Sequence, residues 1–499
     1  MQPRSDIDAL ARDLGASRFT GEGVVALLGA DAQAAIDRMV AAPARRAALR
    51  SPGALATLVR VLLLGDAVPE AEVADALPTL GVDGAVALGL VRVADGTATP
   101  LLTIRPYRFR DAVGAGEWWI ASDLDELSGV WPLRPDHVLG VGGAARTLAQ
   151  LLPPVEAERA LDLGTGCGVI ALHLRRLARS VVATDISERA LRFAALNAAL
   201  NGVDGIETRL GSLYEPVDGE RFDLIASNPP FVITPRAEGV PEYEYRDGGR
   251  TGDALMAEVV RGLAAHLEPG GDARLLGNWE TVDGEPGLER VAAWSDGLAA
   301  WAIERDALDP VRYAELWLRD GGTLPRDAEH DALMTAWLDD FSARGVDAIG
   351  MGWLAARRAE PATPRRFEAV AQPVALEHAG AHLAAAFDDA AWLHGVDDAA
   401  LAAQHLTVAA DVTEARHQRP GASGPNVIEL RQGGALGRTL SVDTALAALV
   451  GACDGELPVG ALIGAIAGLL EVDEAVLSAD LLPRVRELVV TGFLRPVSD

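Results

Sequence analysis

Lysine is absent from this chain of 499 residues, so each of its 44 basic residues is an arginine. Against them stand 72 acidic residues, which give a formal net charge of −28 and a pI near 4.7. Phosphate backbones are bound chiefly by basic surfaces, so this balance argues against a broad nucleic-acid-binding face. The abundance of alanine and glycine beside arginine is typical of codon bias in a GC-rich genome.

Cysteines and long hydrophobic runs are also scarce. The two cysteines, Cys167 and Cys453, lie in separate regions and form no disulfide framework. The longest apolar run, residues 457–470, is shorter than the about 20 residues that a membrane-spanning helix needs, and the N-terminus has no signal-peptide pattern. We therefore expect a cytoplasmic protein with no membrane partner, whose length predicts more than one domain.

A glycine-rich segment organises the middle of the chain. Residues 160–172 (ALDLGTGCGVIAL) begin as a short apolar run and continue into three glycines at alternate positions. Glycine lets a ligand approach the backbone closely, and the first turn of a helix presents unpaired N–H groups. The pattern predicts a buried strand, a ligand-binding turn and a helix over 168–178. The candidate binding residues here are Asp162, Gly164, Thr165, Gly166 and Gly168.

A second buried strand, residues 180–187, presents a carboxylate near its end. An acidic residue about twenty positions after a glycine turn is where doubly wound sheets hold the hydroxyls of a ribose. Asp185 is therefore a candidate for this contact. Ser187 is expected to be the N-cap of a helix over 188–200.

A third strand, residues 221–227, runs directly into Asn228-Pro229-Pro230-Phe231. The two prolines fix the backbone and donate no hydrogen bonds, so the Asn228 side-chain oxygen and the Pro229 carbonyl are available as acceptors. Together they can hold both hydrogens of a planar NH2 group, on whose face Phe231 can stack. We predict that Asn228, Pro229, Pro230 and Phe231 form the catalytic site.

In this order and spacing, these motifs resemble the class I S-adenosylmethionine-dependent methyltransferases that act on amino or amide nitrogens. Asp247-Gly248-Gly249 and Gly252 make the chain similar to the HemK family of protein glutamine N5-methyltransferases over about residues 130–280. The resemblance implies S-adenosylmethionine as cofactor, no metal, and in-line methyl transfer that depends on positioning rather than on a general base. It implies cofactor contacts at Asp162, Gly164, Thr165, Gly166, Gly168, Asp185, Ile186, Ser212, Leu213 and Asn228.

The chain departs from the family pattern at two positions. Cys167 stands where serine is common, and Gly211-Ser212-Leu213 stands where an acid usually contacts the adenine of the cofactor. In the family, the segment before the glycine turn folds over the cofactor. Residues 136–140 are therefore expected either to contact it or to serve only as a capped helix start.

The pattern of elements predicts an α/β fold, a seven-stranded Rossmann-like methyltransferase sheet with winged-helix-like helical modules at both ends. We expect the last two strands of the sheet at residues 299–305 and 348–357, as a reversed hairpin. The predicted division is an N-terminal winged-helix-like module (1–110), a class I methyltransferase domain (111–364), an α+β connecting region (365–440) and a C-terminal winged-helix-like module (441–499).

The flanking regions carry weaker signals. Two arginine clusters in residues 45–50 and 105–110 are read either as a docking surface for RNA, DNA or an acidic partner or as ordinary solvated surface. Residues 441–499 hold 3 arginines and 9 acids, which favours protein docking over phosphate binding. His378 and His382 lie one helical turn apart, but no cysteine or HExxH motif accompanies them, so we expect no metal site.

Three functional hypotheses follow. The first is an N-methyltransferase that acts on a glutamine-type side chain of a protein, with the flanking modules docking that protein. The alternative is a nucleobase amine methyltransferase that binds RNA or DNA through the N-terminal module. The third, a regulatory protein with a degenerate methyltransferase core, is disfavoured because the glycines, Asp185 and the Asn-Pro-Pro-Phe sequence are all intact.

Overall fold

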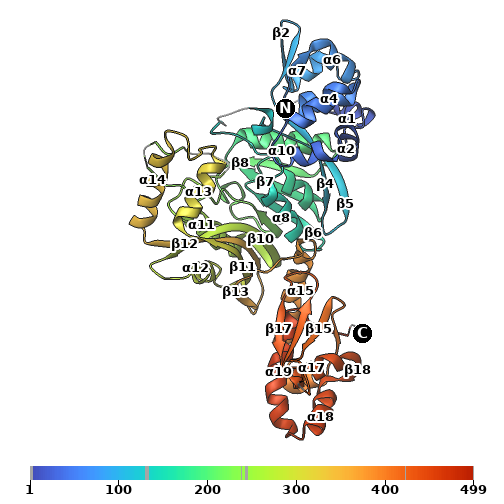
Figure 1. Ribbon diagram of the computed structural model, residues 1–499, viewed down its shortest axis with the longest axis vertical. Coiled ribbons are helices and arrows are strands. Elements are labelled where there is room, and N and C mark those ends of the chain that lie inside the picture. Colours follow the sequence, from blue (N-terminus) through green and yellow to red (C-terminus); the bar gives the residue numbers. More distant parts are fainter. Residues whose placement is uncertain (1–3, 130–133, 238, 242–245, 422, 498–499) are drawn as a thin grey trace.

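The computed structural model describes residues 4–129, 134–237, 239–241, 246–421 and 423–497. Three parts follow one another along the long axis of the molecule (Figure 1): N-terminal helices at one end, a large sheet with its helices in the middle, and C-terminal residues at the other end. No helix among the described residues combines the length and the apolar character needed to cross a lipid bilayer.

Over the described residues, the central sheet has eight strands, in the order β13-β11-β12-β10-β9-β6-β7-β8. β8, β7, β6, β9 and β10 run parallel, whereas β12 is antiparallel to both β10 and β11. The strands are β6 (Ala157–Leu163), β7 (Ala178–Asp185), β8 (Ile206–Leu210), β9 (Phe222–Ser227), β10 (Leu267–Val282), β11 (Ala299–Leu308), β12 (Val346–Arg357) and β13 (Arg365–Ala369).

This sheet is that of an α/β Rossmann-like fold, and its reversed strand lies where the sequence predicts it. The predicted number of seven strands is wrong, because β13 adds an eighth strand parallel to β11. β13 reads Arg-Arg-Phe-Glu-Ala, and none of its residues is fully buried. A short, charged strand at a sheet edge lacks the apolar run by which buried parallel strands are recognised.

Helices cover both faces of the sheet. Successive β6 residues face opposite sides: Ala160 belongs to the core under α8 (Gly143–Leu151), α9 (Val169–Arg175) and α10 (Glu188–Leu200). Leu161 belongs to the core under α11 (Ala254–His266) and α12 (Gly287–Trp294). Burial on both faces explains why the central strands are continuous apolar runs.

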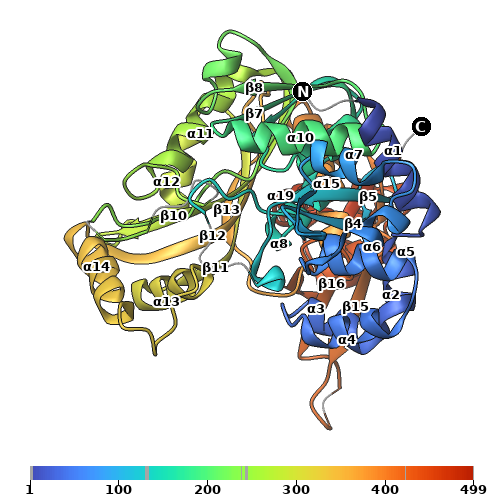
Figure 2. The same ribbon diagram turned by 90° about the horizontal axis from the view of Figure 1, so that it is seen from above.

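Two further helices stand between β11 and β12. They are α13 (Pro310–Asp320) and α14 (His330–Ala343). Their core of Tyr313, Trp337 and Phe341 also contains Val232 and Ile233, which follow the Asn-Pro-Pro-Phe sequence. Figure 2 shows this helix pair at the end of the sheet away from the N-terminal helices.

The N-terminal part is mainly helical and ends in a small antiparallel sheet of order β1-β3-β2. A longer hairpin, β4 (Thr103–Arg110) and β5 (Ala115–Ser122), then leads towards the central sheet. The remaining elements are α1 (Arg4–Ala16), α2 (Gly21–Leu28), α3 (Ala30–Ile36), α4 (Ala42–Arg50), α5 (Ala54–Leu58) with a π-helical turn (Val59–Leu63), β1 (Val68–Pro69), α6 (Glu70–Ala76), α7 (Gly81–Ala87), β2 (Val91–Ala94) and β3 (Thr97–Pro100).

The long helix α15 (Leu376–His394) joins the sheet to the C-terminal part, since it contacts both α8 and α19. Two three-stranded sheets lie beyond it, of orders β15-β16-β17 and β18-β14-β19. The elements are α16 (Asp398–Ala402), β14 (His405–Val408), β15 (Val412–His417), β16 (Val427–Gln432), β17 (Thr439–Val442), α17 (Thr444–Ala452), β18 (Asp454–Pro458), α18 (Val459–Leu470), α19 (Glu474–Val490) and β19 (Leu494–Pro496).

Candidate functional site

The carboxyl ends of β6, β7 and β9 meet at one edge of the sheet. Leu163 at the end of β6 pairs with Thr184 in β7 and with Ser227 in β9. The Ser227 hydroxyl also donates a hydrogen bond of 2.7 Å to the Leu163 carbonyl. The glycine turn, Asp185 and Asn228 each follow directly after these paired residues. The structure therefore brings the three sequence motifs together, at the edge where open α/β sheets bind ligands.

The glycines of the turn have two different environments. Gly164, Gly166 and Gly168 have φ values of 76°, 53° and 83°, which other residues adopt only with strain. A Cβ built on Gly164 or Gly166 would meet no described atom within 4 Å, whereas one on Gly168 would lie 2.7 Å from the Ala194 Cα. The first two glycines thus leave an open surface on the turn, and the third permits close packing of α9 against α10.

Asp185 fixes the shape of this turn. Its Oδ2 accepts a hydrogen bond of 2.9 Å from the Gly166 N–H, and its Oδ1 accepts one of the same length from the Ser187 N–H. Ser187 is the N-cap residue of α10, but its side chain makes no capping hydrogen bond. The predicted N-cap position is therefore confirmed, and the Asp185 carboxylate, rather than the serine hydroxyl, accepts a hydrogen bond from the backbone there.

Asp162 lies beneath the turn and is 1% exposed. Its Oδ2 accepts a 2.6 Å hydrogen bond from the Thr165 hydroxyl. Burial raises the pKa of Asp162 to about 7, although the bond from Thr165 acts in the opposite direction. These two residues therefore support the turn from within the protein.

The next candidates line the approach to Asp185. Ile186 is an exposed hydrophobic side chain, with 54% of its surface accessible. The Gly211 N–H donates to the Asp185 carbonyl at 3.0 Å, so the segment that contains Ser212 and Leu213 lies beside it. Leu213 has a φ of 47°, which is uncommon for a branched residue. An exposed apolar side chain at this edge is suited to contact a planar group.

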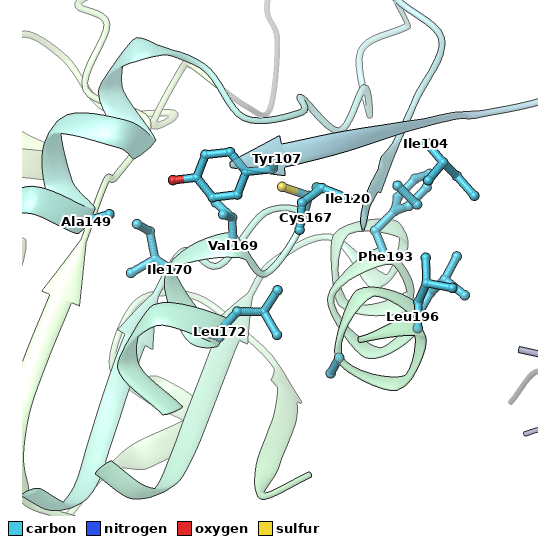
Figure 3. Close-up of a cluster of buried hydrophobic side chains, with 14 of the residues drawn as sticks. Ile104, Tyr107, Ile120, Ala149, Cys167, Val169, Ile170, Leu172, Phe193 and Leu196 are labelled. Atoms are coloured by element: carbon cyan, nitrogen blue, oxygen red, sulfur yellow. The ribbon is translucent and has the colours of Figure 1, made fainter. Parts of the chain in front are cut away.

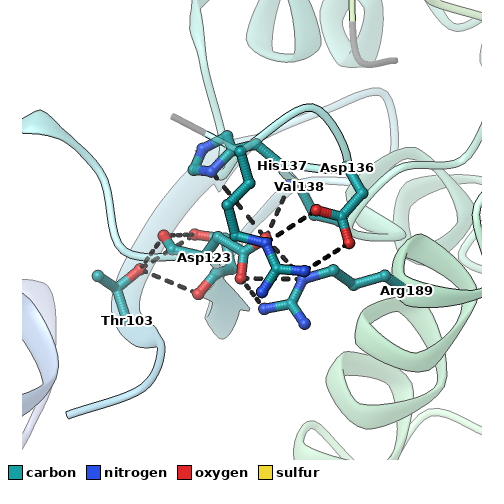
Figure 4. Close-up of polar contacts among 8 residues, drawn as sticks. Thr103, Asp123, Asp136, His137, Val138 and Arg189 are labelled. Carbon is teal, nitrogen blue, oxygen red and sulfur yellow. Dashed lines mark hydrogen bonds and ion pairs between the residues drawn. The ribbon is translucent and has the colours of Figure 1, made fainter. Parts of the chain in front are cut away.

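A polar cluster that the sequence did not reveal fixes residues 136–138 (Figure 4). Asp123 is buried, and its Oδ2 accepts hydrogen bonds from the Val138 N–H (2.9 Å) and from the Arg189 Nε (2.8 Å). Arg189 belongs to the first turn of α10, four residues after Asp185. Burial lowers the pKa of His137, the residue between Asp136 and Val138. The segment before α8 is thus attached close to the candidate cofactor edge.

The β4–β5 hairpin packs against α9, beside the glycine turn (Figure 3). The Tyr107 hydroxyl lies 3.1 Å from Nε2 of His173 on α9, and the Tyr107 ring lies in a buried cluster with Cys167. Asn197 of α10 is fully buried and donates from Nδ2 to the carbonyls of Cys167 (2.8 Å) and Ala121 (2.9 Å). The hairpin and the glycine turn therefore share one supporting side chain, which no motif in the sequence identified.

The Asn-Pro-Pro-Phe sequence leaves β9 with an unusual acceptor. The Oδ1 of Asn228 is buried and has no hydrogen-bond partner among the described residues. A buried polar atom normally has a partner, because leaving it unpaired costs about 1–3 kcal/mol. This oxygen is suited to accept a hydrogen bond from a bound group.

The Gly-Gly-x-x-Gly segment folds back against this sequence. Val232 N–H donates to the Arg246 carbonyl at 2.9 Å, and Phe231 forms an isolated β-bridge with Asp247. The Asp247 Oδ1 accepts from the Gly249 N–H at 3.0 Å. The two motifs, separate in the sequence, thus form one structure.

A pocket lies between the two motifs. A Cβ on Gly252 would be 2.6 Å from Oε2 of the buried Glu280 and 2.9 Å from the Arg344 guanidinium, so glycine allows the segment to approach this ion pair. The lining residues are Pro230, Phe231, Val232, Gly248, Arg250, Gly252, Asp253, Leu255, Met256 and Asn278. Among the described residues, no group of three histidine, cysteine or acidic side chains is arranged to hold a metal ion.

Three regions of the chain are similar to known protein families. Residues 140–290 match the model of the methyltransferase small domain, and residues 16–101 and 384–496 match two domains of unknown function, DUF7059 and DUF7782. The chain is 37% identical over 166 residues to the release factor glutamine methyltransferase of Xylella fastidiosa (strain Temecula1), covering 32% of this chain and 58% of that relative. It is 33% identical over 151 residues to the ribosomal protein uL3 glutamine methyltransferase of Bradyrhizobium diazoefficiens, covering 28% and 46%.

Among solved structures, a methyltransferase from Pyrococcus furiosus aligns at 18% identity with a TM-score of 0.26, over 43% of this chain and 80% of that one. The chain spans about half the length of the curated relatives it matches. The matched region contains the glycine turn, Asp185 and the Asn-Pro-Pro-Phe sequence. The resemblance of this region to HemK-type S-adenosylmethionine-dependent methyltransferases is confirmed.

Proposed function

We propose that this chain is an S-adenosylmethionine-dependent N-methyltransferase whose acceptor is the side-chain amide nitrogen of a glutamine-type residue in a protein. The observation that carries the proposal is the buried, unpartnered Oδ1 of Asn228, which follows a strand paired in register with the strand before the glycine turn. The named activities of the relatives, both glutamine methyltransferases, support the same acceptor chemistry.

The residues present fit the cofactor. Gly164 and Gly166 offer backbone that no described side chain covers, and the Asp185 carboxylate and the exposed Ile186 flank it. In this proposal Asp185 holds the ribose and Ile186, Ser212 and Leu213 surround the adenine, whereas the buried Asp162 and Thr165 act by supporting the turn. S-adenosylmethionine supplies an activated methyl group on a sulfonium.

The acceptor chemistry belongs to the chain's own residues. An amide nitrogen is a poor nucleophile because its lone pair is delocalised into the carbonyl. Hydrogen bonds from its two N–H groups to the Asn228 Oδ1 and the Pro229 carbonyl draw electron density towards the nitrogen and aim it. Phe231 stacks on the planar amide, and Pro230 fixes its position.

The flanking parts are proposed to dock the substrate protein. In the N-terminal part, the order from α5 to β3 and the sheet order β1-β3-β2 support a winged-helix-like module. The C-terminal sheet has the order β18-β14-β19. In it β18 and β19 correspond to β1 and β2 as outer strands, and β14 takes the central position that β3 has. We propose the four parts 1–110, 111–364, 365–440 and 441–499, of which the third contributes β13 to the central sheet and β14 to the C-terminal sheet. Because the relatives are named for a release factor and a ribosomal protein, we place the activity in the cytoplasm.

The test is to incubate the chain with S-adenosylmethionine labelled in its methyl group and with cell extract, purified release factors or ribosomal protein uL3. We expect label that protease releases and nuclease does not, and that mass spectrometry locates on a glutamine. Label that only nuclease removes would instead favour the nucleobase alternative. An Asn228→Ala variant that transfers as much methyl as the wild type would refute the assigned site.

A further inference from the structure

Tyr313, on the inserted helix α13, connects two segments that border the pocket. It is fully buried, and its hydroxyl oxygen accepts a hydrogen bond of 3.1 Å from the Ile233 N–H and one of 2.8 Å from the Asn278 Nδ2. Ile233 lies two residues after Phe231, and Asn278 lies in β10. One phenol therefore ties the strand β10 to the loop that carries the acceptor motif.

Asn278 occupies a part of β10 that extends past its parallel neighbour. β9 ends at Ser227, which pairs with Leu275. Beyond this point β12 is the only strand that pairs with β10 within the described part of the chain. Asn278 pairs with Met351 of β12 and lines the pocket together with Phe231. The free edge of β10 thus borders the acceptor loop, and an amide side chain lies on that border.

The Asn278 amide can form more hydrogen bonds than it has among the described residues. A primary amide offers two N–H donors and one carbonyl acceptor. Among the described residues its side chain makes the one hydrogen bond to Tyr313, which leaves further hydrogen-bonding capacity in a residue that is 1% exposed and lines the pocket. A buried polar side chain with capacity to spare is expected to bind a polar group.

We propose that Asn278 contacts the carboxamide of the acceptor side chain and that Tyr313 is a positioning residue that fixes the orientation of the Asn278 amide. This inference rests on the proposed function and extends it, because Asn228 and the Pro229 carbonyl account for the NH2 hydrogens alone. An amine, which has no carbonyl group, could not make the carboxamide contact that Asn278 provides. The α13–α14 insertion is then a specificity element, since it supplies Tyr313.

The first test is kinetic. We expect Asn278→Ala and Tyr313→Phe each to lower kcat/KM for the protein acceptor by about tenfold, the effect of one lost hydrogen bond to a polar partner. The affinity for S-adenosylhomocysteine should stay within about twofold, and the double variant should be no slower than Asn278→Ala, since the two residues act together. Trp337→Phe, in the same aromatic core, is the packing control and should lower kcat/KM less than Tyr313→Phe does. Additive losses in the double variant would overturn the positioning role.

The second test measures binding without turnover. The chain has five asparagines, so selective 15N-asparagine labelling gives a simple side-chain NH2 spectrum of the full chain. In the presence of S-adenosylhomocysteine, N-acetylglutamine N-methylamide should shift the signals of Asn228 and Asn278 and leave Asn426 in place. The carboxylate analogue, N-acetylglutamate N-methylamide, should shift neither. Tyr313→Phe should move the Asn278 signal of the free protein.

The outcomes separate the two claims. A shift of Asn228 without Asn278 overturns this inference and leaves the proposed function standing. No shift of either signal also overturns the inference, and if the wild type transfers no methyl group to protein, the proposed function falls as well. Shifts of both signals by the amide alone support the inference even before the substrate protein is identified.

Discussion

The two kinds of glycine in the turn allow a paired test of what the turn does. Substituting alanine at either Gly164 or Gly168 forces a side chain into a left-handed backbone conformation, which costs about 1 kcal/mol. At Gly168 the new Cβ would also lie 2.7 Å from the Ala194 Cα and 2.8 Å from its Cβ. Overpacking of this kind costs about 1–3 kcal/mol. We therefore expect Gly168→Ala to cost about 2–4 kcal/mol and Gly164→Ala about 1 kcal/mol.

Ligand affinity should show the reverse order. A Cβ at Gly164 meets no described atom within 4 Å, so its methyl group would project into the surface assigned to the cofactor. Differential scanning calorimetry measures the stability of each variant, and isothermal titration with S-adenosylhomocysteine measures the affinity. Gly164→Ala should weaken binding by about tenfold or more, the loss of one good contact, with little change in the unfolding temperature.

A third variant tests the cause of the instability. Ala194→Gly removes the Cβ of Ala194 but leaves its Cα, which is the nearer atom. The double variant with Gly168→Ala should therefore remain destabilised relative to Ala194→Gly alone. Full recovery, or equal stability of the Gly164 and Gly168 variants, would refute the packing argument. Unchanged affinity in Gly164→Ala would separate the turn from the cofactor.

Three further variants test the site and the buried titrating groups. Asn228→Ala should abolish methyl transfer while S-adenosylhomocysteine affinity changes little, and equal loss of both in filter-binding and transfer assays would contradict its role towards the acceptor. Burial raises the pKa of Asp162 to about 7, so its contribution to stability is full below about pH 4 and is lost as the pH rises to 7. This loss is worth about 4 kcal/mol. Asp162→Asn should remove it, as measured by denaturant titrations at several pH values. Burial lowers the pKa of His382 to about 4, and the nearby charges of Arg495 and Arg438 act in the same direction. The free energy of unfolding should therefore fall as the pH drops from about 6.5 to 4. If a His382→Gln variant loses stability over the same pH range, another group is responsible.

Much of the candidate site follows from the sequence because its parts are local. Each motif combines a buried strand with the few residues after it, and parallel strands end at the same edge. Gly164, Asp185 and Asn228 are therefore found from strand, turn and spacing alone. The residues that hold these loops in place were not found, because Asn197, 30 positions after Cys167, makes its contacts across helix and hairpin.

The fold, too, was predicted correctly only where the sequence pattern is local. Strong periodic patterns place the central helices and the reversed strand, but the helix expected over 168–178 ends at Arg175, since β7 begins at Ala178. The eighth strand was missed because its residues are charged and lie at an edge. Pairings between distant segments, such as β14 inside the C-terminal sheet, depend on tertiary contacts that no local pattern contains.

The two loops that define the site are each supported by a segment outside the minimal sheet. Asn197 and Asn201 both accept from the β5 backbone and donate to it, so α10 joins the N-terminal hairpin much as a neighbouring strand would. Asn197 also donates to the Cys167 carbonyl in the glycine turn. On the other side, Tyr313 of the inserted helix holds the loop after Phe231. Groups that fix loops in this way reduce the freedom lost when a ligand binds. It follows that the segments outside the minimal sheet hold the glycine turn and the loop after Phe231 directly.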